Sequence, residues 1–147
     1  MSTYINELTE YLDSSFIGNC PVKFKLDIDQ IDFPLSHSIP IGLIINEAVT
    51  NSIKYAFDVC GDCFISILLK KDRDGLYLLK ISDNGKGMPD NFEISESNSL
   101  GMRLIEGLSN DIHAELKIYN DNGSVIELLF AVPENQNERV PSSPNEK

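Results

Sequence analysis

The stretch Ile39–Phe57, IPIGLIINEAVTNSIKYAF, has the spacing of an amphipathic helix, and the rest of the chain is best understood from it. Pro40 follows Ser38, so we expect the helix to begin there, with the proline in its first turn. Small and apolar residues recur at steps of three and four and predict one buried stripe: Ile41, Ile45, Ala48 or Val49, Ser52 and Ala56.

Polar residues share another face of this helix. Glu47, Asn51, Lys54 and Tyr55 recur at the same steps, which places them one above the next. From the helix alone, an ordinary solvated face explains this spacing as well as a binding site does. The choice between the two therefore depends on segments further along the chain.

Length and charge limit the classes of protein to which the chain can belong. With 147 residues, 41% of them hydrophobic, it is expected to form one folded domain over residues 1–132. The net charge of −11 argues against sequence-independent binding of nucleic acid. No apolar run approaches the roughly 18 residues of a membrane span and no signal peptide pattern opens the sequence, which predicts a cytoplasmic protein whose domain has no membrane contact. Residues 133–147 contain few apolar side chains and are expected to be disordered.

The order of the elements predicts the fold. Helical and strand patterns alternate, and turn residues at 72–75 and 120–123 favour hairpins. We predict an α/β (α+β) fold, a two-layer sandwich in which three helices cover one face of a mixed, mostly antiparallel sheet of about five strands. Helices are expected at 2–16, 39–57 and 100–112, and strands at 22–28, 63–71, 76–82, 115–119 and 124–132. Residues 83–99 form a long loop of the kind that often serves as a lid.

Cys60 and Cys63 have the CxxC spacing of half a zinc site or a redox motif. A zinc site needs two more ligands, and Cys20, His37 and His113 are each isolated. A redox motif needs a helix after the pair, whereas a strand pattern follows. We interpret the two cysteines as part of a turn.

Two further segments have the composition of ligand-binding loops. DNGKG at 83–87 leaves a strand, and Gly85 and Gly87 allow positive φ and close approach to a ligand. Met88 follows them. At residues 97–105 a loop of small residues enters a helix, whose free N–H groups favour anions, and Arg103 adds a cationic donor. Alone, the first segment is weak evidence, because D-N-G also forms plain turns. For the second segment alone, tight packing at Gly101 and a solvated Arg103 are the better explanation.

Together and in this order, the segments resemble the ATP-binding domain of the GHKL superfamily, and more narrowly that of sensor histidine kinases with a short lid. NEAVTNSIKYAF at 46–57 is similar to the N-box of that family, DNGKG at 83–87 to its first glycine box and LGMRLI at 100–105 to its second. Gly123-Ser124 matches the small hydroxyl position beside the base. The resemblance covers about residues 1–132 and implies a Bergerat-type fold that binds ATP and Mg²⁺.

The resemblance also implies a role for each matching residue. Glu47 would be catalytic, polarising the attacking group or ordering the water shell of the metal, and Asn51 would coordinate Mg²⁺. Asp83 would accept a hydrogen bond from the adenine amine, and Ser124 would assist through water. The other implied nucleotide-binding residues are Lys54, Tyr55, Gly85, Gly87, Met88, Leu100, Gly101, Met102 and Arg103.

The chain departs from the family pattern in two respects. Ser97-Asn98-Ser99 replaces the usual glycine pair, and Phe92 is all that remains of the aromatic lid motif. Neither His37, expected in the loop before the central helix, nor His113, expected just after the last helix, has the setting of a phosphoacceptor.

The resemblance therefore implies a catalytic domain that transfers the γ-phosphoryl group of ATP to a histidine on a separate domain. Residues 1–16 would be the junction helix to that domain, and a response regulator would receive the phosphoryl group next. The full-length protein is expected to be a homodimer. This chain alone is expected to be a monomer with little turnover.

Two alternatives stay open from the sequence. The same N-box occurs in GHKL serine kinases of the anti-sigma-factor type, so the residue that accepts the phosphoryl group is not fixed. A degenerate nucleotide-binding or interaction module is the other alternative, although the joint presence of all three motifs counts against it.

Overall fold

The computed structural model describes residues 4–8, 10, 22–56, 61–72, 74–88 and 100–133. The elements follow in the order β1 (Val22–Ile28), α2 (Leu35–Asn51), η1 (Ser52–Ala56), β2 (Cys63–Lys71), β3 (Tyr77–Asp83), α3 (Leu100–Asp111), β4 (Glu115–Asn120) and β5 (Ser124–Phe130). Residues 4–8 and 10 are helical as well, and the rest of the helix predicted at 2–16 lies outside the described residues.

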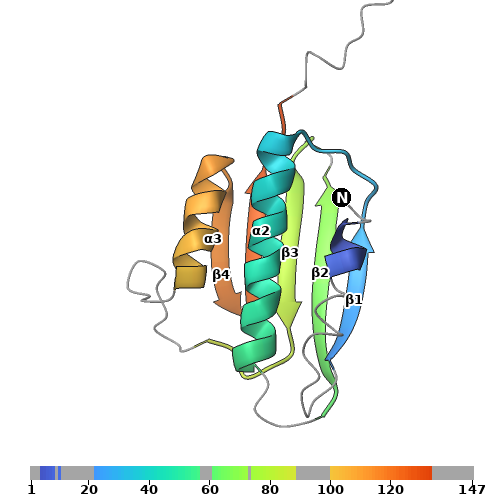
Figure 1. Cartoon of the computed structure of the whole chain (residues 1–147), viewed down its shortest axis with the longest axis vertical. Helices are drawn as coiled ribbons and strands as arrows, with labels where there is room; N and C mark the ends of the chain where they lie inside the picture. The colour runs from blue at the N-terminus through green and yellow to red at the C-terminus, as the bar shows by residue number, and fades with distance from the viewer. Residues whose placement is uncertain are drawn as a thin grey trace, which may run out of the picture.

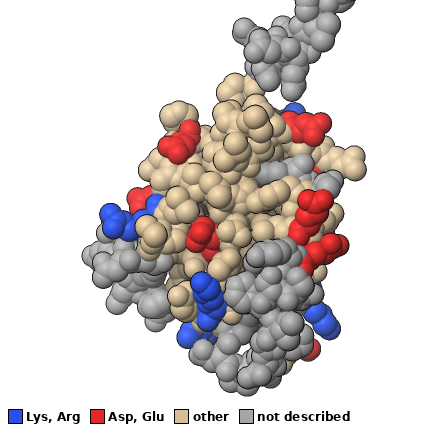
Figure 2. All heavy atoms as spheres, viewed as in Figure 1, with Lys and Arg blue, Asp and Glu red and all other residues tan. Residues whose placement is uncertain are grey.

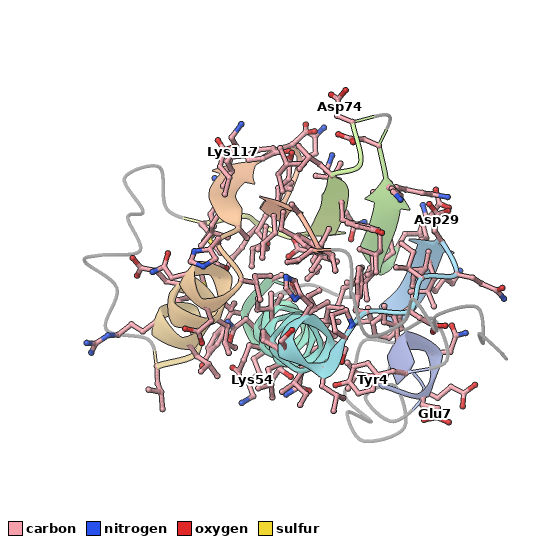
Figure 3. All side chains as sticks on the ribbon, turned by 90° about the horizontal axis from the view of Figure 1, so that it is seen from above. Tyr4, Glu7, Asp29, Lys54, Asp74 and Lys117 are labelled. Carbon is pink, nitrogen blue, oxygen red and sulfur yellow. The ribbon has the colours of Figure 1, made fainter. Side chains whose placement is uncertain are left out.

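The five strands form one sheet with the order β1-β2-β3-β5-β4. The β1–β2 pair is parallel and the other three pairs are antiparallel. Hairpins join β2 to β3 and β4 to β5, whereas α3 and β4 lie between β3 and β5 in the sequence. Figures 1 and 3 show α2, α3 and the N-terminal helical residues on the same face of this sheet. The predicted two-layer sandwich with a mixed, mostly antiparallel sheet is confirmed.

The core lies between the helices and the sheet. Alternate residues of β2 are buried, as expected for a strand with one covered face. Ile5 of the N-terminal helical residues is fully buried in the same cluster. The core residues contributed by the central helix and strands include Ile41, Ile44, Ile45, Val49, Ile65, Ile67, Leu69, Leu79 and Leu128.

Helix α2 begins one turn earlier than the sequence predicts. Leu35 is its first residue, so Pro40 lies inside the helix rather than in its first turn. The physical reason is Pro34 at the N-cap, whose φ of −61° suits that position. The Pro34 carbonyl accepts hydrogen bonds from the N–H groups of His37 and Ser38, both at 2.9 Å, and so starts the first turn.

The same shift corrects the placement of the histidines. His37 lies in the first turns of α2 and not in the preceding loop, and its ring is 6.4 Å from that of Phe130. His113 follows α3 as predicted and has a positive φ of 54°.

The predicted buried stripe of the central helix is confirmed at all of its positions. Its buried residues are Ile41, Ile45, Ala48, Val49, Ser52 and Ala56. The α-helix itself ends at Asn51, and Ser52–Ala56 continue as a π-helix. Short π-helical turns are rare and frequently occur at functional sites. Phe57, the predicted end of the helix, lies outside the described residues.

Several other predictions also fall outside the described residues. They concern the disordered tail beyond residue 133, the loop at 89–99, and Cys20 and Cys60. Cys63 is the buried first residue of β2, so a strand does follow the cysteine pair. Among the helices that the structure describes, none is long and apolar enough to span a membrane.

Candidate functional site

Asp83 is the centre of a hydrogen-bond cluster at the end of β3. It is only 4% exposed. Its Oδ2 accepts hydrogen bonds from the hydroxyl groups of Ser52 at 2.8 Å and Ser124 at 2.5 Å. Its Oδ1 accepts from the backbone N–H groups of Gly85 at 2.9 Å and Ser124 at 3.1 Å. These bonds come from η1, from the loop after β3 and from β5, so three segments hold the carboxylate in one orientation.

The two glycines after Asp83, Gly85 and Gly87, are needed for different structural reasons. A Cβ atom on Gly85 would lie 2.6 Å from the Cβ of Ala56, so the loop packs directly on the end of η1. The Lys86 N–H also donates to the Ala56 carbonyl at 2.9 Å. Gly87 has a φ of +78°, which favours glycine, as predicted. The loop is therefore attached to both ends of the π-helix, at Ser52 and at Ala56.

Two asparagine side chains hold the start of the long loop. The Asn120 Oδ1 accepts from the Met88 N–H at 2.9 Å, and its Nδ2 donates to the Met88 carbonyl at 2.8 Å. Asn84 accepts from the Phe64 N–H at 2.8 Å. The backbone of residues 84–88 is thus fixed from β2, from β4 and from η1.

A second cluster forms where α2 passes α3. A Cβ atom on Gly101 would lie 2.7 Å from Oε2 of Glu47 and 3.6 Å from Oδ1 of Asn51. The Asn51 Nδ2 donates to the Sδ of Met102 at 3.6 Å. Glu47 and Asn51 are half-buried and Met102 is 4% exposed. The structure therefore brings the predicted N-box pair against the N-terminus of the helix that carries the second glycine box.

The remaining predicted residues do not join these clusters. Lys54 and Tyr55 on η1 are exposed, Tyr55 by 65%, and Figure 3 shows Lys54 on the side of α2 turned away from the sheet. Leu100 and Arg103 are exposed at the start of α3. On the face drawn in Figure 2, the basic side chains are scattered rather than gathered in one patch. An anion at this site would depend on local donors and not on a broad positive field.

The Glu47–Asn51 pair is suitable for a magnesium ion. Among the residues that the structure describes, no three His, Cys, Asp or Glu side chains form a ready metal site. Mg²⁺ does not need one, because it commonly takes one or two protein oxygens and completes its shell with water and phosphate. The two side chains reach a common point above Gly101, and the Asn51 nitrogen is already used by Met102. The Asn51 Oδ1 is then the atom available to a cation.

Two functional candidates are not assigned a role from the sequence. Ser52 is predicted only as part of the buried stripe, although a hydroxyl in such a stripe, next to Asn51, needs a buried partner. Asn120 is predicted only as a hairpin turn residue, and nothing in the local pattern links that position to Met88, 32 residues away.

The fold and both clusters define an ATPase-type domain, and the comparison with protein families agrees. Residues 36–135 match the family described as "Histidine kinase-, DNA gyrase B-, and HSP90-like ATPase". The chain belongs to this family, and membership implies that it binds ATP. The predicted recognition of an ATP-binding catalytic domain of a sensor histidine kinase is confirmed.

Individual relatives are histidine kinases. The chain is 24% identical over 101 residues to blue-light-activated histidine kinase 2 of Erythrobacter litoralis, an alignment that covers 69% of this chain and 29% of that protein. It is 32% identical over 75 residues to the sensor histidine kinase PdtaS of Mycobacterium tuberculosis, covering 50% of this chain and 14% of that protein. The chain thus spans less than a third of the length of either relative.

Solved structures show the same fold. A histidine kinase domain from an Erythrobacter litoralis blue-light-activated kinase superposes with a TM-score of 0.79 at 19% identity, covering 88% of this chain and 60% of that one. The catalytic domain of the histidine kinase ThkA superposes with a TM-score of 0.65 at 15% identity, covering 90% and 92%.

Proposed function

We propose that this chain is the ATP–Mg²⁺-binding domain of a sensor histidine kinase and supplies the γ-phosphoryl group to a histidine on another domain or chain. The observation that carries the proposal is that two consecutive residues of the central helix each belong to a different cluster. Asn51 belongs to the cluster at Gly101, and the next residue, Ser52, belongs to the cluster at Asp83. A nucleotide that uses both clusters would have its base at Asp83 and its phosphates at the N-terminus of α3.

Each cluster has the chemistry for its part of the nucleotide. A buried carboxylate can accept a hydrogen bond from an exocyclic amine, which selects adenine over a base with oxygen at that position. The N–H groups of Leu100, Gly101 and Met102 begin α3, where the positive end of the helix dipole favours phosphate. Lys54 and Arg103 are exposed and long enough to add charged donors from either side.

Glu47 and Asn51 would hold the phosphate end in place. Mg²⁺, when bound, neutralises charge on the phosphate oxygens during transfer. Asn51 would provide an oxygen ligand, and the Glu47 carboxylate would accept hydrogen bonds from water or from the attacking group. Phosphoryl transfer depends mostly on positioning and charge neutralisation. The buried faces of α2 and α3 would hold these side chains in fixed positions.

The partners and location follow from the same proposal. The acceptor would be a histidine on a separate domain, a response regulator would receive the phosphoryl group next, the domain would be cytoplasmic, and the longer protein would act as a homodimer. The ATP-binding unit would occupy residues 1–132. Because neither His37 nor His113 is beside the Glu47–Asn51 pair, we expect no autophosphorylation of this chain with labelled ATP. Rapid labelling of either histidine would contradict the proposal.

Binding of MgATP to Asn51 variants tests the proposal directly. We expect MgATP to raise the melting temperature of the unmodified chain by mass action. Asn51→Ala removes the oxygen ligand and Asn51→Asp adds a charge beside Glu47, so both should abolish the Mg²⁺-dependent shift while the ligand-free melting temperature stays similar. Asn110→Ala, at an exposed position of α3, is the matched control. An Asn51→Ala variant that still responds to MgATP like the unmodified chain would overturn the proposal.

A further inference from the structure

All the acceptor positions of the Asp83 carboxylate are occupied. It receives four hydrogen bonds, two hydroxyl groups on Oδ2 and two backbone N–H groups on Oδ1. A carboxylate offers about four lone-pair sites. An incoming amine must therefore displace one of these donors or share an oxygen with it.

The two hydroxyl groups differ in what they lose when they are displaced. Ser124 is half-buried, so its hydroxyl can turn to water or to the ligand. Ser52 is 8% exposed at the junction of α2 and η1, where a released hydroxyl has little access to water. Leaving a buried donor without a partner costs more than exchanging an accessible one. The Ser52–Asp83 bond is thus the one expected to persist when a base is bound.

Ser52 also connects Asp83, and with it the loop that follows, to a rigid helix. Its helix is fixed by the buried stripe, and the loop after Asp83 docks on the far end of η1 through the Lys86–Ala56 hydrogen bond of 2.9 Å. The Ser52 hydroxyl therefore ties the carboxylate to the most rigid element nearby. The two backbone donors come from the loop and from the β5 end, which do not belong to that helix.

We propose that Ser52 is a positioning residue for base selection: it retains its hydrogen bond to Asp83 when nucleotide binds, and so orients the carboxylate toward the exocyclic amine of adenine. This inference rests on the proposed nucleotide site but adds a residue to it. Ser52 does not touch the nucleotide. It acts through Asp83, so its loss should change discrimination between bases and leave phosphate binding alone.

The test compares ADP with inosine diphosphate, which has oxygen in place of the exocyclic amine, by titration calorimetry of the full chain. Ser52→Ala removes one donor to a charged group, so we expect the Kd for ADP to rise about tenfold. The Kd for inosine diphosphate should stay within about twofold, because that base gains nothing from the aligned carboxylate. Alanine favours helices, so the variant should remain folded, which its melting curve checks.

Ser109→Ala is the matched control. Ser109 is also a buried helical serine, 1% exposed, but its hydroxyl donates to the Ile105 carbonyl at 2.7 Å within α3. Loss of that hydroxyl should change stability and leave the ratio of the two Kd values as in the unmodified chain.

The outcomes separate this inference from the proposed function. If the unmodified chain binds neither diphosphate, the proposed function fails. If it prefers ADP, and Asp83→Asn removes that preference while Ser52→Ala keeps it, the nucleotide site stands and the role of Ser52 is refuted. Equal weakening of both ligands by Ser52→Ala also refutes it, because that result indicates a general structural effect.

Discussion

Gly101 and Glu47 are in contact across the α2–α3 interface, and the contact depends on the missing side chain at residue 101. A Cβ atom there would lie 2.7 Å from Oε2 of Glu47, well inside normal contact distance. The glycine thus makes room for the carboxylate at the first turn of α3. Local packing therefore explains why a glycine stands at this position of the second glycine box, independently of any contact with phosphate.

Gly101→Ala should impair function more than folding. The atom that must move is the end of a flexible side chain, and alanine is favourable in a helix, so we expect the free energy of unfolding to change by less than about 1 kcal/mol. Displacement of Glu47 should weaken MgATP binding by about tenfold. Calorimetry and chemical denaturation measure the two effects. Gly107→Ala in the same helix, with nothing within 4 Å of its Cβ, is the control and should retain normal binding.

Gly85→Ala should impair folding more than function, because backbone atoms block the new side chain. The added Cβ would lie 2.6 Å from the Cβ of Ala56 and 2.7 Å from its carbonyl carbon, neither of which can rotate away. Overpacking of this kind costs about 1–3 kcal/mol, and we expect a loss near the upper end in a denaturation experiment. Gly61→Ala, another loop glycine with nothing within 4 Å, should be close to neutral. Similar stability of the two variants would show that the loop does not dock on η1.

The sequence predicted the layers of this fold well because they depend on periodicity. Val22–Ile28 and Cys63–Lys71 agree with prediction to the residue, and the buried stripe of the central helix is correct throughout. The periodicity of hydrophobic residues was sufficient to predict these features. The start of α2 involves hydrogen bonds to the Pro34 carbonyl, and the π-helix is hydrogen-bonded to Asp83 and Lys86, contacts that hydrophobic periodicity does not encode.

The candidate site was predictable by residue type but not by contact. The motifs identified Glu47, Asn51, Asp83 and Gly101. Lys54 and Tyr55, which the sequence predicts on the same face as Glu47, are exposed on η1 and do not join either cluster. A π-helix changes the number of residues per turn, so the spacing of an α-helix no longer applies beyond Asn51. The role of Ser52 depends on a partner 31 residues away, which local spacing cannot indicate.

Asn120→Ala should loosen the backbone at Met88. The alanine removes both the acceptor of the Met88 N–H and the donor to its carbonyl. Because the pair is exposed, we expect a loss of only about 1 kcal/mol in global stability. Hydrogen exchange at the Met88 amide should nevertheless become much faster, since local opening no longer breaks a hydrogen bond. Unchanged exchange at Met88 would show that the amide is protected by other contacts.

Tyr119 supplies a test of the β4–β5 hairpin by titration. Its hydroxyl donates to Glu127 Oε2 at 2.7 Å, and this bond, with smaller effects of burial and of the charges on Glu127 and Asp121, raises the pKa of Tyr119 to about 12. The difference in ultraviolet absorbance between the unmodified chain and Tyr119→Phe isolates this ionisation. Glu127→Gln should return the pKa of Tyr119 toward the ordinary tyrosine value of 10.0.

The sign of the stability effect follows from the raised pKa. A phenol that ionises less readily in the folded state stabilises that state below pH 10, and the contribution disappears as the pH rises toward 12. The difference in unfolding free energy between the unmodified chain and Tyr119→Phe should therefore shrink over this interval. Glu115→Gln is the control, because that carboxylate on β4 pairs with Lys117 at 3.8 Å and not with the phenol. If Glu115→Gln lowered the pKa of Tyr119 as much as Glu127→Gln, general charge and not the hydrogen bond would be its cause.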